Sequence, residues 1–177
     1  MAIEKHPFSI ATLLNTVADK HYAEALSKDL SFITAIDPAL PYLLGDGSLL
    51  EHALSLLVYN AIKFTRQGSV TLSAHLLAME NRRAQLEFSI KDTGPGIPLD
   101  RQKYLFQAFE PLDSSLILCN SGLGLGLLIC LHLVKLLDGE LAVESSLGKG
   151  SLFHIKLWME NQPVFCINRE NHLAHKI

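Results

Sequence analysis

A run of six residues, Asp92-Thr93-Gly94-Pro95-Gly96-Ile97, places a carboxylate and two glycines directly after an alternating, strand-like segment. A carboxylate in this position can accept a hydrogen bond from an exocyclic amine. Gly94 and Gly96 let the backbone approach a flat ring closely, because they lack a side chain. Taken alone, the same residues also describe an ordinary turn after a strand, so both interpretations stay open.

Two polar side chains earlier in the chain, Asn60 and Lys63, lie about one turn apart on an expected helix. An amide oxygen suits magnesium, which prefers oxygen ligands and retains several waters. A lysine ammonium can meet a phosphate as a point charge. The simpler alternative is a helix C-terminus with a capping asparagine and a solvated lysine.

Three glycines after the run, Gly122, Gly124 and Gly126, open an apolar helix. The free N–H groups at a helix start, together with the helix dipole, bind anions without any basic side chain. The spacing is not that of a Walker or Rossmann loop, and the preceding segment is not strand-like. Close helix packing through small residues explains the same glycines equally well.

Hydrophobic periodicity predicts the elements that must position these residues. The helices are expected at Phe8 to about Lys28, about Leu49 to Phe64, Pro98 to about Phe106 and about Gly124 to Leu137, and the strands at Leu30–Ile36, Val70–Leu76, Ala84–Ile90, Glu140–Ser145 and Ser151–Trp158. Ser48 and Glu51 predict a capping box for the second helix. The sum is an α/β two-layer sandwich with helices on one face of a mixed, mostly antiparallel sheet.

The composition excludes several classes of protein. A length of 177 residues suits one domain, expected at residues 1–159 and followed by a C-terminal extension or linker at 160–177. A net charge of −3 argues against a nucleic-acid binder. The cysteines lack paired or metal-like spacing, which indicates reduced thiols in the cytoplasm. The most apolar run, Leu123 to Leu137, is too short to span a membrane.

The order and spacing of three blocks together resemble the nucleotide-binding boxes of the sensor histidine kinase catalytic domain. The blocks are Asn60-Ala61-Ile62-Lys63-Phe64-Thr65, Asp92–Ile97 and Gly122-Leu123-Gly124-Leu125-Gly126-Leu127. This family belongs to an ATPase group that also contains gyrase, the mismatch-repair ATPases and the ninety-kilodalton heat-shock chaperones. The resemblance covers about Phe8 to Trp158, and it implies the Bergerat-type ATP-binding fold.

The resemblance also implies a role for each block. Asn60 would coordinate the magnesium that bridges the ATP phosphates, Lys63 would assist the phosphates, and Asp92 would accept a hydrogen bond from adenine. The second glycine block would hold the β- and γ-phosphates, and Ser151 would reach adenine through water. The full set of expected ATP-binding residues is Asn60, Lys63, Asp92, Gly94, Gly96, Ile97, Phe109, Gly122, Leu123, Gly124, Leu125, Gly126 and Ser151, with Asn60 as the metal ligand.

Two features depart from the family pattern. Leu56 lies one turn before Asn60, where many histidine kinases have asparagine and gyrase-like relatives have a glutamate base, so we expect only slow intrinsic ATP hydrolysis. The lid between the aromatic box, Leu105–Phe109, and the second glycine block carries no basic residue. Its centre, Leu116 to Cys119, is apolar instead.

The function that the resemblance implies is Mg-ATP binding and phosphoryl donation to a histidine on a separate dimerisation domain, with a response regulator or receiver domain downstream. No histidine of this chain has a phosphoacceptor context. The setting would be cytoplasmic, within a soluble or a membrane-anchored sensor, without nucleic acid and without direct membrane contact. One alternative is a degenerate regulatory module that acts through its apolar lid. A gyrase-like clamp is a further alternative, against which Leu56 counts.

Overall fold

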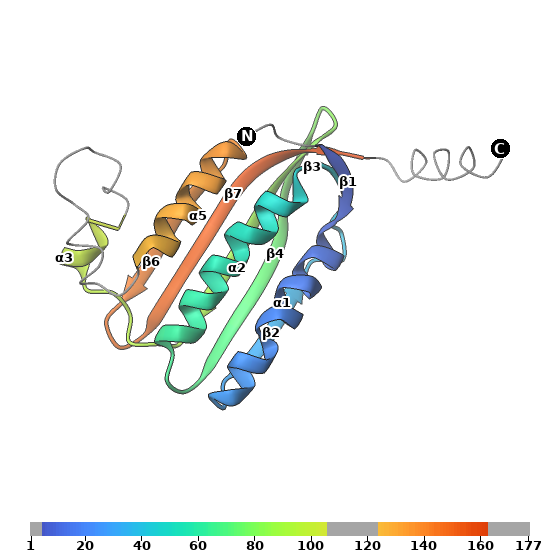
Figure 1. The fold of residues 1–177 in the computed structure, drawn as a ribbon. Coiled ribbons are helices and arrows are strands. Elements are labelled where there is room, and N and C mark those ends of the chain that lie inside the picture. Colours follow the sequence, from blue (N-terminus) through green and yellow to red (C-terminus); the bar gives the residue numbers. More distant parts are fainter. Residues whose placement is uncertain (1–4, 106–123, 163–177) are drawn as a thin grey trace.

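The computed structural model describes residues 5–105 and 124–162, and these form two layers. The helices α1 (Ile10–Ser27), α2 (Gly47–Phe64) and α5 (Gly124–Leu136) lie across one face of a twisted sheet (Figure 1). A short helix, α3 (Leu99–Gln102), projects at one end of the sandwich. The expected α/β two-layer arrangement is confirmed.

The sheet has seven strands, in the order β1-β3-β7-β5-β4-β2, with β6 paired to β7 beside β3. Only β2 and β4 pair in parallel, and every other pairing is antiparallel. The strands are β1 (His6–Ser9), β2 (Ser31–Ile36), β3 (Tyr42–Gly45), β4 (Ser69–Glu80), β5 (Arg83–Asp92), β6 (Glu140–Ser146) and β7 (Gly150–Asn161).

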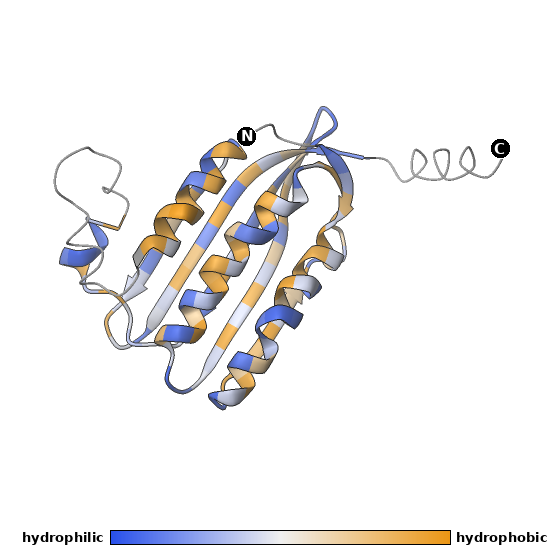
Figure 2. Ribbon diagram, viewed as in Figure 1, coloured by the Kyte–Doolittle hydropathy of each residue, from blue (hydrophilic) through white to orange (hydrophobic). Residues whose placement is uncertain are grey.

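The hydrophobic core lies between the sheet and the helices. Alternate residues of β5, from Ala84 to Ile90, are buried, whereas the residues between them are only partly covered. In register, Phe88 pairs with Ile155 of β7 and Ala74 of β4, so buried side chains line up across the central strands. Figure 2 shows hydrophobic residues, in orange, along the helices and the strands.

The central helix α2 is held at both ends. Asp46 is its N-cap and accepts a hydrogen bond from Leu49 N at 3.1 Å. At its C-terminus, Lys28 Nζ donates to the carbonyl oxygens of Ile62 and Lys63, at 2.8 and 3.2 Å. These contacts satisfy backbone groups that a helix end leaves unpaired, and they fix the last turn of α2 over the sheet.

The structure corrects several details of the expected elements. The capping box is wrong, because Asp46 rather than Ser48 caps α2. The first helix begins at Ile10, because Ser9 caps it and the preceding residues pair with β3 as β1. The sequence pattern missed β1 and β3, whose four residues each are too few to show alternation. The last strand runs past Trp158 to Asn161.

Several sequence-based expectations lie outside the described residues. These are the aromatic-box residue Phe109, the lid, Gly122 and Leu123, and the C-terminal extension beyond residue 162. Cys130 is buried in α5, and Cys119 and Cys166 lie outside the description. Within the described segments, no helix is long and apolar enough to cross a membrane.

Candidate functional site

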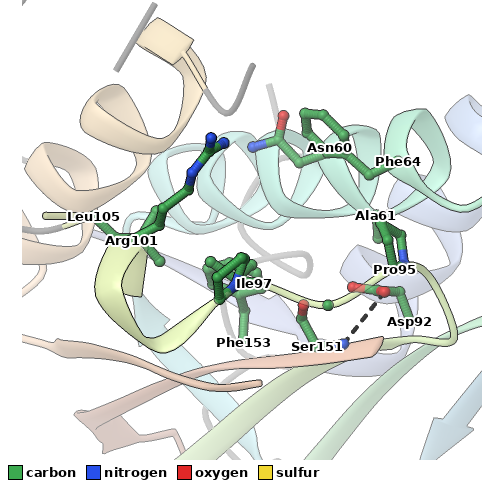
Figure 3. A pocket seen from close by; sticks show the side chains of 12 residues that line it. Asn60, Ala61, Phe64, Asp92, Pro95, Ile97, Arg101, Leu105, Ser151 and Phe153 are labelled. Carbon is green, nitrogen blue, oxygen red and sulfur yellow. Dashed lines mark hydrogen bonds between the residues drawn. The ribbon is translucent and has the colours of Figure 1, made fainter. Parts of the chain in front are cut away.

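A cavity of about 160 Å³ lies between the C-terminal half of α2, the segment that contains α3, and the ends of β5 and β7 (Figure 3). Most of its wall is apolar, and its polar groups are few. The lining residues are Asn60, Ala61, Phe64, Asp92, Pro95, Gly96, Ile97, Pro98, Arg101, Leu105, Ser151 and Phe153. The expected residues Asn60, Asp92, Gly96, Ile97 and Ser151 therefore line one cavity, although they come from distant parts of the chain.

Strand register brings Asp92 and Ser151 together. Asp92 pairs with Ser151 across β5 and β7. The buried residues of β5 alternate from Ala84 to Ile90, and Asp92 is the next buried residue of this alternation. Asp92 Oδ1 accepts hydrogen bonds from Gly94 N at 2.8 Å and from Ser151 N at 3.3 Å. Both bonds go to Oδ1, and within residues 5–105 and 124–162 no hydrogen bond reaches Oδ2, so this oxygen can accept a bond from a ligand.

Burial raises the pKa of the Asp92 carboxyl above its usual range, and the hydrogen bonds from Gly94 and Ser151 oppose this rise only in part. The side chain is 7% exposed. A carboxylate that is buried without a charged partner is costly. At the base of an apolar cavity, this carboxylate can accept a hydrogen bond from a ligand.

A polar network holds the rest of the cavity floor. Ser145 Oγ accepts from Ile97 N at 2.8 Å and lies 2.9 Å from Ser151 Oγ. Gln102 Nε2 donates to the carbonyl oxygens of Ile97, at 2.6 Å, and Ser145, at 3.0 Å. The loop that carries Ile97 and the helix α3 are thereby tied to β6 and β7.

Asn60 is the polar group of the opposite wall. It is 7% exposed, and its Nδ2 is buried without a hydrogen-bond partner among the described residues. Thr65 Oγ1, at the C-cap of the same helix, is likewise buried and unpartnered. Unsatisfied buried polar groups are rare in folded proteins. The Asn60 amide is therefore suited to a ligand that enters the cavity.

The start of α5 leaves space beside Asn60. Among the described residues outside the helix's own backbone, the nearest atoms to a Cβ added at Gly126 are Leu56 Cδ2, at 3.7 Å, and Asn60 Nδ2, at 4.0 Å. These are ordinary contact distances, so close helix packing does not require glycine here. Leu56 is partly buried against the core on the same side of α2.

Two expected binding residues with described side chains do not line the cavity. Lys63 is exposed, and its Nζ lies 5.3 Å from the centroid of the Phe64 ring. Leu125 is 72% exposed. Gly124 and Gly126 belong to α5 and Gly94 to the loop after β5, and none of them is a lining residue. Gly94 contributes instead through its bond to Asp92.

The expected binding residues did not include the lining residues Ala61, Phe64, Pro95, Pro98, Arg101, Leu105 and Phe153. Phe153 has the inward alternation of Ile155 and Leu157 on β7, a signal that the sequence contains. Arg101 and Leu105 are four residues apart in a segment expected to be helical, which is the spacing of one helix face. Arg101 lies before the aromatic box, whereas the lid lies after it, so Arg101 is not among the lid residues.

The family comparison agrees with this geometry. Residues 45–161 match the model of the "Histidine kinase-, DNA gyrase B-, and HSP90-like ATPase" family, and the chain belongs to this family. The match begins at Gly45, just before the cap of α2, and ends with β7 at Asn161. It therefore includes every described residue of the cavity.

The relatives with similar sequences are sensor kinases. Sensor protein GacS of Pseudomonas syringae pv. syringae is 37% identical over 158 residues, which are 89% of this chain and 17% of that protein. Signal transduction histidine-protein kinase BarA of Escherichia coli (strain K12) is 35% identical over 160 residues, again 89% and 17%. This chain thus spans only about a sixth of the curated relatives that it matches.

A solved structure supports the same fold. Full-length ShkA in complex with AMPPNP superimposes with a TM-score of 0.78 at 30% sequence identity. The alignment covers 93% of this chain and 33% of ShkA. The catalytic domain of histidine kinase ThkA also superimposes, with a TM-score of 0.67 at 21% identity over 87% of this chain and 95% of that one, so the two-layer fold predicted from the sequence is that of a histidine kinase catalytic domain.

Proposed function

We propose that this chain binds Mg-ATP in the cavity and donates the γ-phosphate to a histidine on a separate dimerisation domain of a two-component sensor kinase. The observation that carries the proposal is the Asp92 carboxylate, with Oδ1 held by two backbone amides and Oδ2 facing an apolar cavity. Oδ2 would accept a hydrogen bond from the adenine amine, and Ile97, Phe64 and Phe153 would cover the faces of the base.

The donor set fits a magnesium ion that is bound mainly by the nucleotide. No group of three or more His, Cys, Asp or Glu residues that could hold a metal ion occurs in the segments that the structure describes. Asn60 would then supply the protein oxygen, while phosphates and water complete the shell. The ion would neutralise phosphate charge, and Asn60 would fix where that charge lies relative to Asp92.

The remaining residues would position rather than react. Phosphoryl transfer depends mainly on alignment and charge stabilisation. The Ser145–Gln102 network would keep Ile97 against the base, and the backbone at the start of α5 would approach the phosphates. The acceptor histidine and a response regulator would come from parts of the sensor beyond this chain, in the cytoplasm.

A second candidate function is a regulatory module that binds nucleotide weakly. The observation that favours it is Leu56, an apolar side chain that packs against the core one turn before Asn60. Leucine cannot bind a metal or take a proton.

Calorimetric titration with a non-hydrolysable ATP analogue and magnesium tests the two functions. The catalytic function predicts saturable binding of one nucleotide, with GTP bound far more weakly, because the guanine carbonyl oxygen would face the carboxylate. Magnesium should strengthen binding of the ATP analogue and leave adenosine unaffected. Absence of measurable binding by a folded wild-type chain would refute the catalytic function and leave the regulatory module.

A further inference from the structure

We propose that Arg101 binds the phosphate groups of the nucleotide and supplies the positive charge that the lid sequence lacks. This inference rests on the proposed ATP-binding function. It assigns a phosphate contact to a residue that lies before the aromatic box, on α3. The chain has no lysine or arginine between Lys103 and Lys135, so no cation from that segment is available for this role.

The position of Arg101 is set by the contacts of α3. Its backbone N–H donates to the carbonyl oxygen of Pro98 at 2.9 Å. Its neighbour Gln102 is anchored by two hydrogen bonds, to Ile97 and Ser145. The helix is therefore tied to the sheet through the same network that positions Ile97. These contacts therefore fix the backbone from which the Arg101 side chain extends.

The Arg101 side chain lines the cavity at the end away from Asp92. Figure 3 shows the guanidinium extending toward the Asn60 amide, with Asp92 at the opposite end. An elongated ligand whose amine meets Asp92 would place its other end between Asn60 and Arg101. In a nucleotide, the end opposite the base carries the phosphates.

The chemistry of the two groups defines what fits between them. Asn60 Nδ2 is a buried donor without a partner in the described segments. Arg101 has five donors and no acceptor, and no carboxylate of the described residues forms an ion pair with it. The Asn60 Nδ2 and the Arg101 guanidinium are both donors, and donors that converge on one space call for an anion with several oxygens. Phosphate meets this requirement, and a planar guanidinium binds it through two parallel bonds.

A solvated surface arginine is the competing explanation, because Arg101 is exposed as a whole residue. A solvated arginine would add little to the affinity for nucleotide beyond general attraction. General attraction would be shared by Lys103, which is also exposed and lies on the same turn but does not line the cavity. Lys103 is therefore the matched control for the loss of one positive charge.

The experiment compares Arg101→Gln, Arg101→Lys and Lys103→Gln in the full 177-residue chain. Competition against a fluorescent ATP analogue gives the affinities for ATP analogue, ADP and adenosine, with magnesium present. We expect Arg101→Gln to weaken both nucleotides by about ten- to a hundredfold and to leave adenosine unchanged. Arg101→Lys should recover only part of the loss, since it keeps the charge without the fork. Lys103→Gln should resemble wild type.

Each other outcome overturns the inference. Equal losses of nucleotide affinity in Arg101→Gln and Lys103→Gln mean that the affinity depends on net charge and not on a contact of Arg101. A loss for adenosine as large as the loss for ATP means that Arg101 shapes the base site instead. If Arg101→Gln binds ATP analogue as tightly as wild type, the phosphate contact of Arg101 is refuted and the proposed ATP binding stands. If the wild-type chain binds no nucleotide, both proposals are refuted. Thermal melts check that each variant is folded.

Discussion

Ser151 donates its backbone N–H to the Asp92 carboxylate at 3.3 Å, across two strands that pair in register. The bond occupies the oxygen that Gly94 N also contacts, at 2.8 Å. It therefore orients the carboxylate so that the other oxygen faces the cavity (Figure 3). Neither residue needs to move for this oxygen to meet an amine.

Replacing Asp92 with asparagine tests this orientation. The amide keeps an oxygen for Gly94 and Ser151, but it turns a donor toward the adenine amine. A hydrogen bond to a charged group is worth about 1.5–3 kcal/mol, so the affinity for ATP analogue should fall by roughly ten- to a hundredfold. Calorimetry measures the change, and Asp100→Asn on exposed α3 serves as a control. Unchanged affinity in a folded Asp92→Asn protein would refute the adenine contact.

The same carboxyl should make stability depend on pH. Because burial raises the Asp92 pKa in the folded state, the folded chain holds this proton more tightly than the unfolded chain. The contribution of Asp92 to the free energy of unfolding therefore falls as pH rises from the ordinary aspartate pKa through the raised one. At neutral pH, ligand-free Asp92→Asn should melt at the wild-type temperature or above it. A clearly lower melting temperature would show that the charged form stabilises the fold.

Nucleotide affinity should also depend on the protonation of Asp92. It should rise with pH, whereas the contribution of Asp92 to stability falls with pH. Protonated Asp92 presents a hydroxyl in place of an acceptor, so affinity for the ATP analogue should decline as pH falls through the raised pKa. Asp92→Asn should lose most of this decline. A titration of affinity against pH in both proteins, with melts to confirm folding, separates Asp92 from other acidic groups. An identical decline in both would assign the effect elsewhere.

The expected binding residues that line the cavity lie mostly in or beside regular elements. Asp92 and Ser151 end and begin strands whose alternation is visible, and Asn60 belongs to a helix with a clear apolar face. The end of the cavity that Arg101 lines was less accessible, because the neighbouring Gln102 ties this segment to the sheet through bonds to Ile97 and Ser145. The bond to Ser145 joins residues 43 positions apart, which no local pattern encodes. The short strands β1 and β3 were missed for a related reason, since pairing rather than composition creates them.

Intrinsic ATP hydrolysis by this chain should be slow, because no general base lies where Leu56 does. We expect turnover far below about 1 s⁻¹, the lower end of ordinary enzyme rates. Neighbouring Glu51 forms an ion pair with Lys20 across α1 and α2, which directs it away from this role. Release of phosphate from ATP, measured with wild type and with Glu51→Gln, checks the expectation. Rapid hydrolysis that Glu51→Gln abolishes would identify Glu51 as the base.

Gly126→Ala separates the two interpretations of the second glycine block. Within the part of the chain that the structure describes, the added methyl meets Leu56 and Asn60 at ordinary distances, and alanine favours a helix over glycine by about 0.5–1 kcal/mol. The variant should therefore melt at a higher temperature than wild type. The same methyl lies over the Asn60 amide, where phosphate and magnesium are proposed to bind, so affinity for the ATP analogue should fall by at least about tenfold while adenosine binds as before.

Gly96→Ala provides the contrast for that experiment. Gly96 has a φ of +72°, and a Cβ there would lie 2.1 Å from the carbonyl oxygen of Ser146. Alanine at this position should lower the melting temperature as well as the affinity, because the loop must shift away from β6. Stability and binding thus change in opposite directions at Gly126 and in the same direction at Gly96. If Gly126→Ala destabilised the fold and weakened adenosine as much as ATP, close packing rather than phosphate approach would explain this glycine.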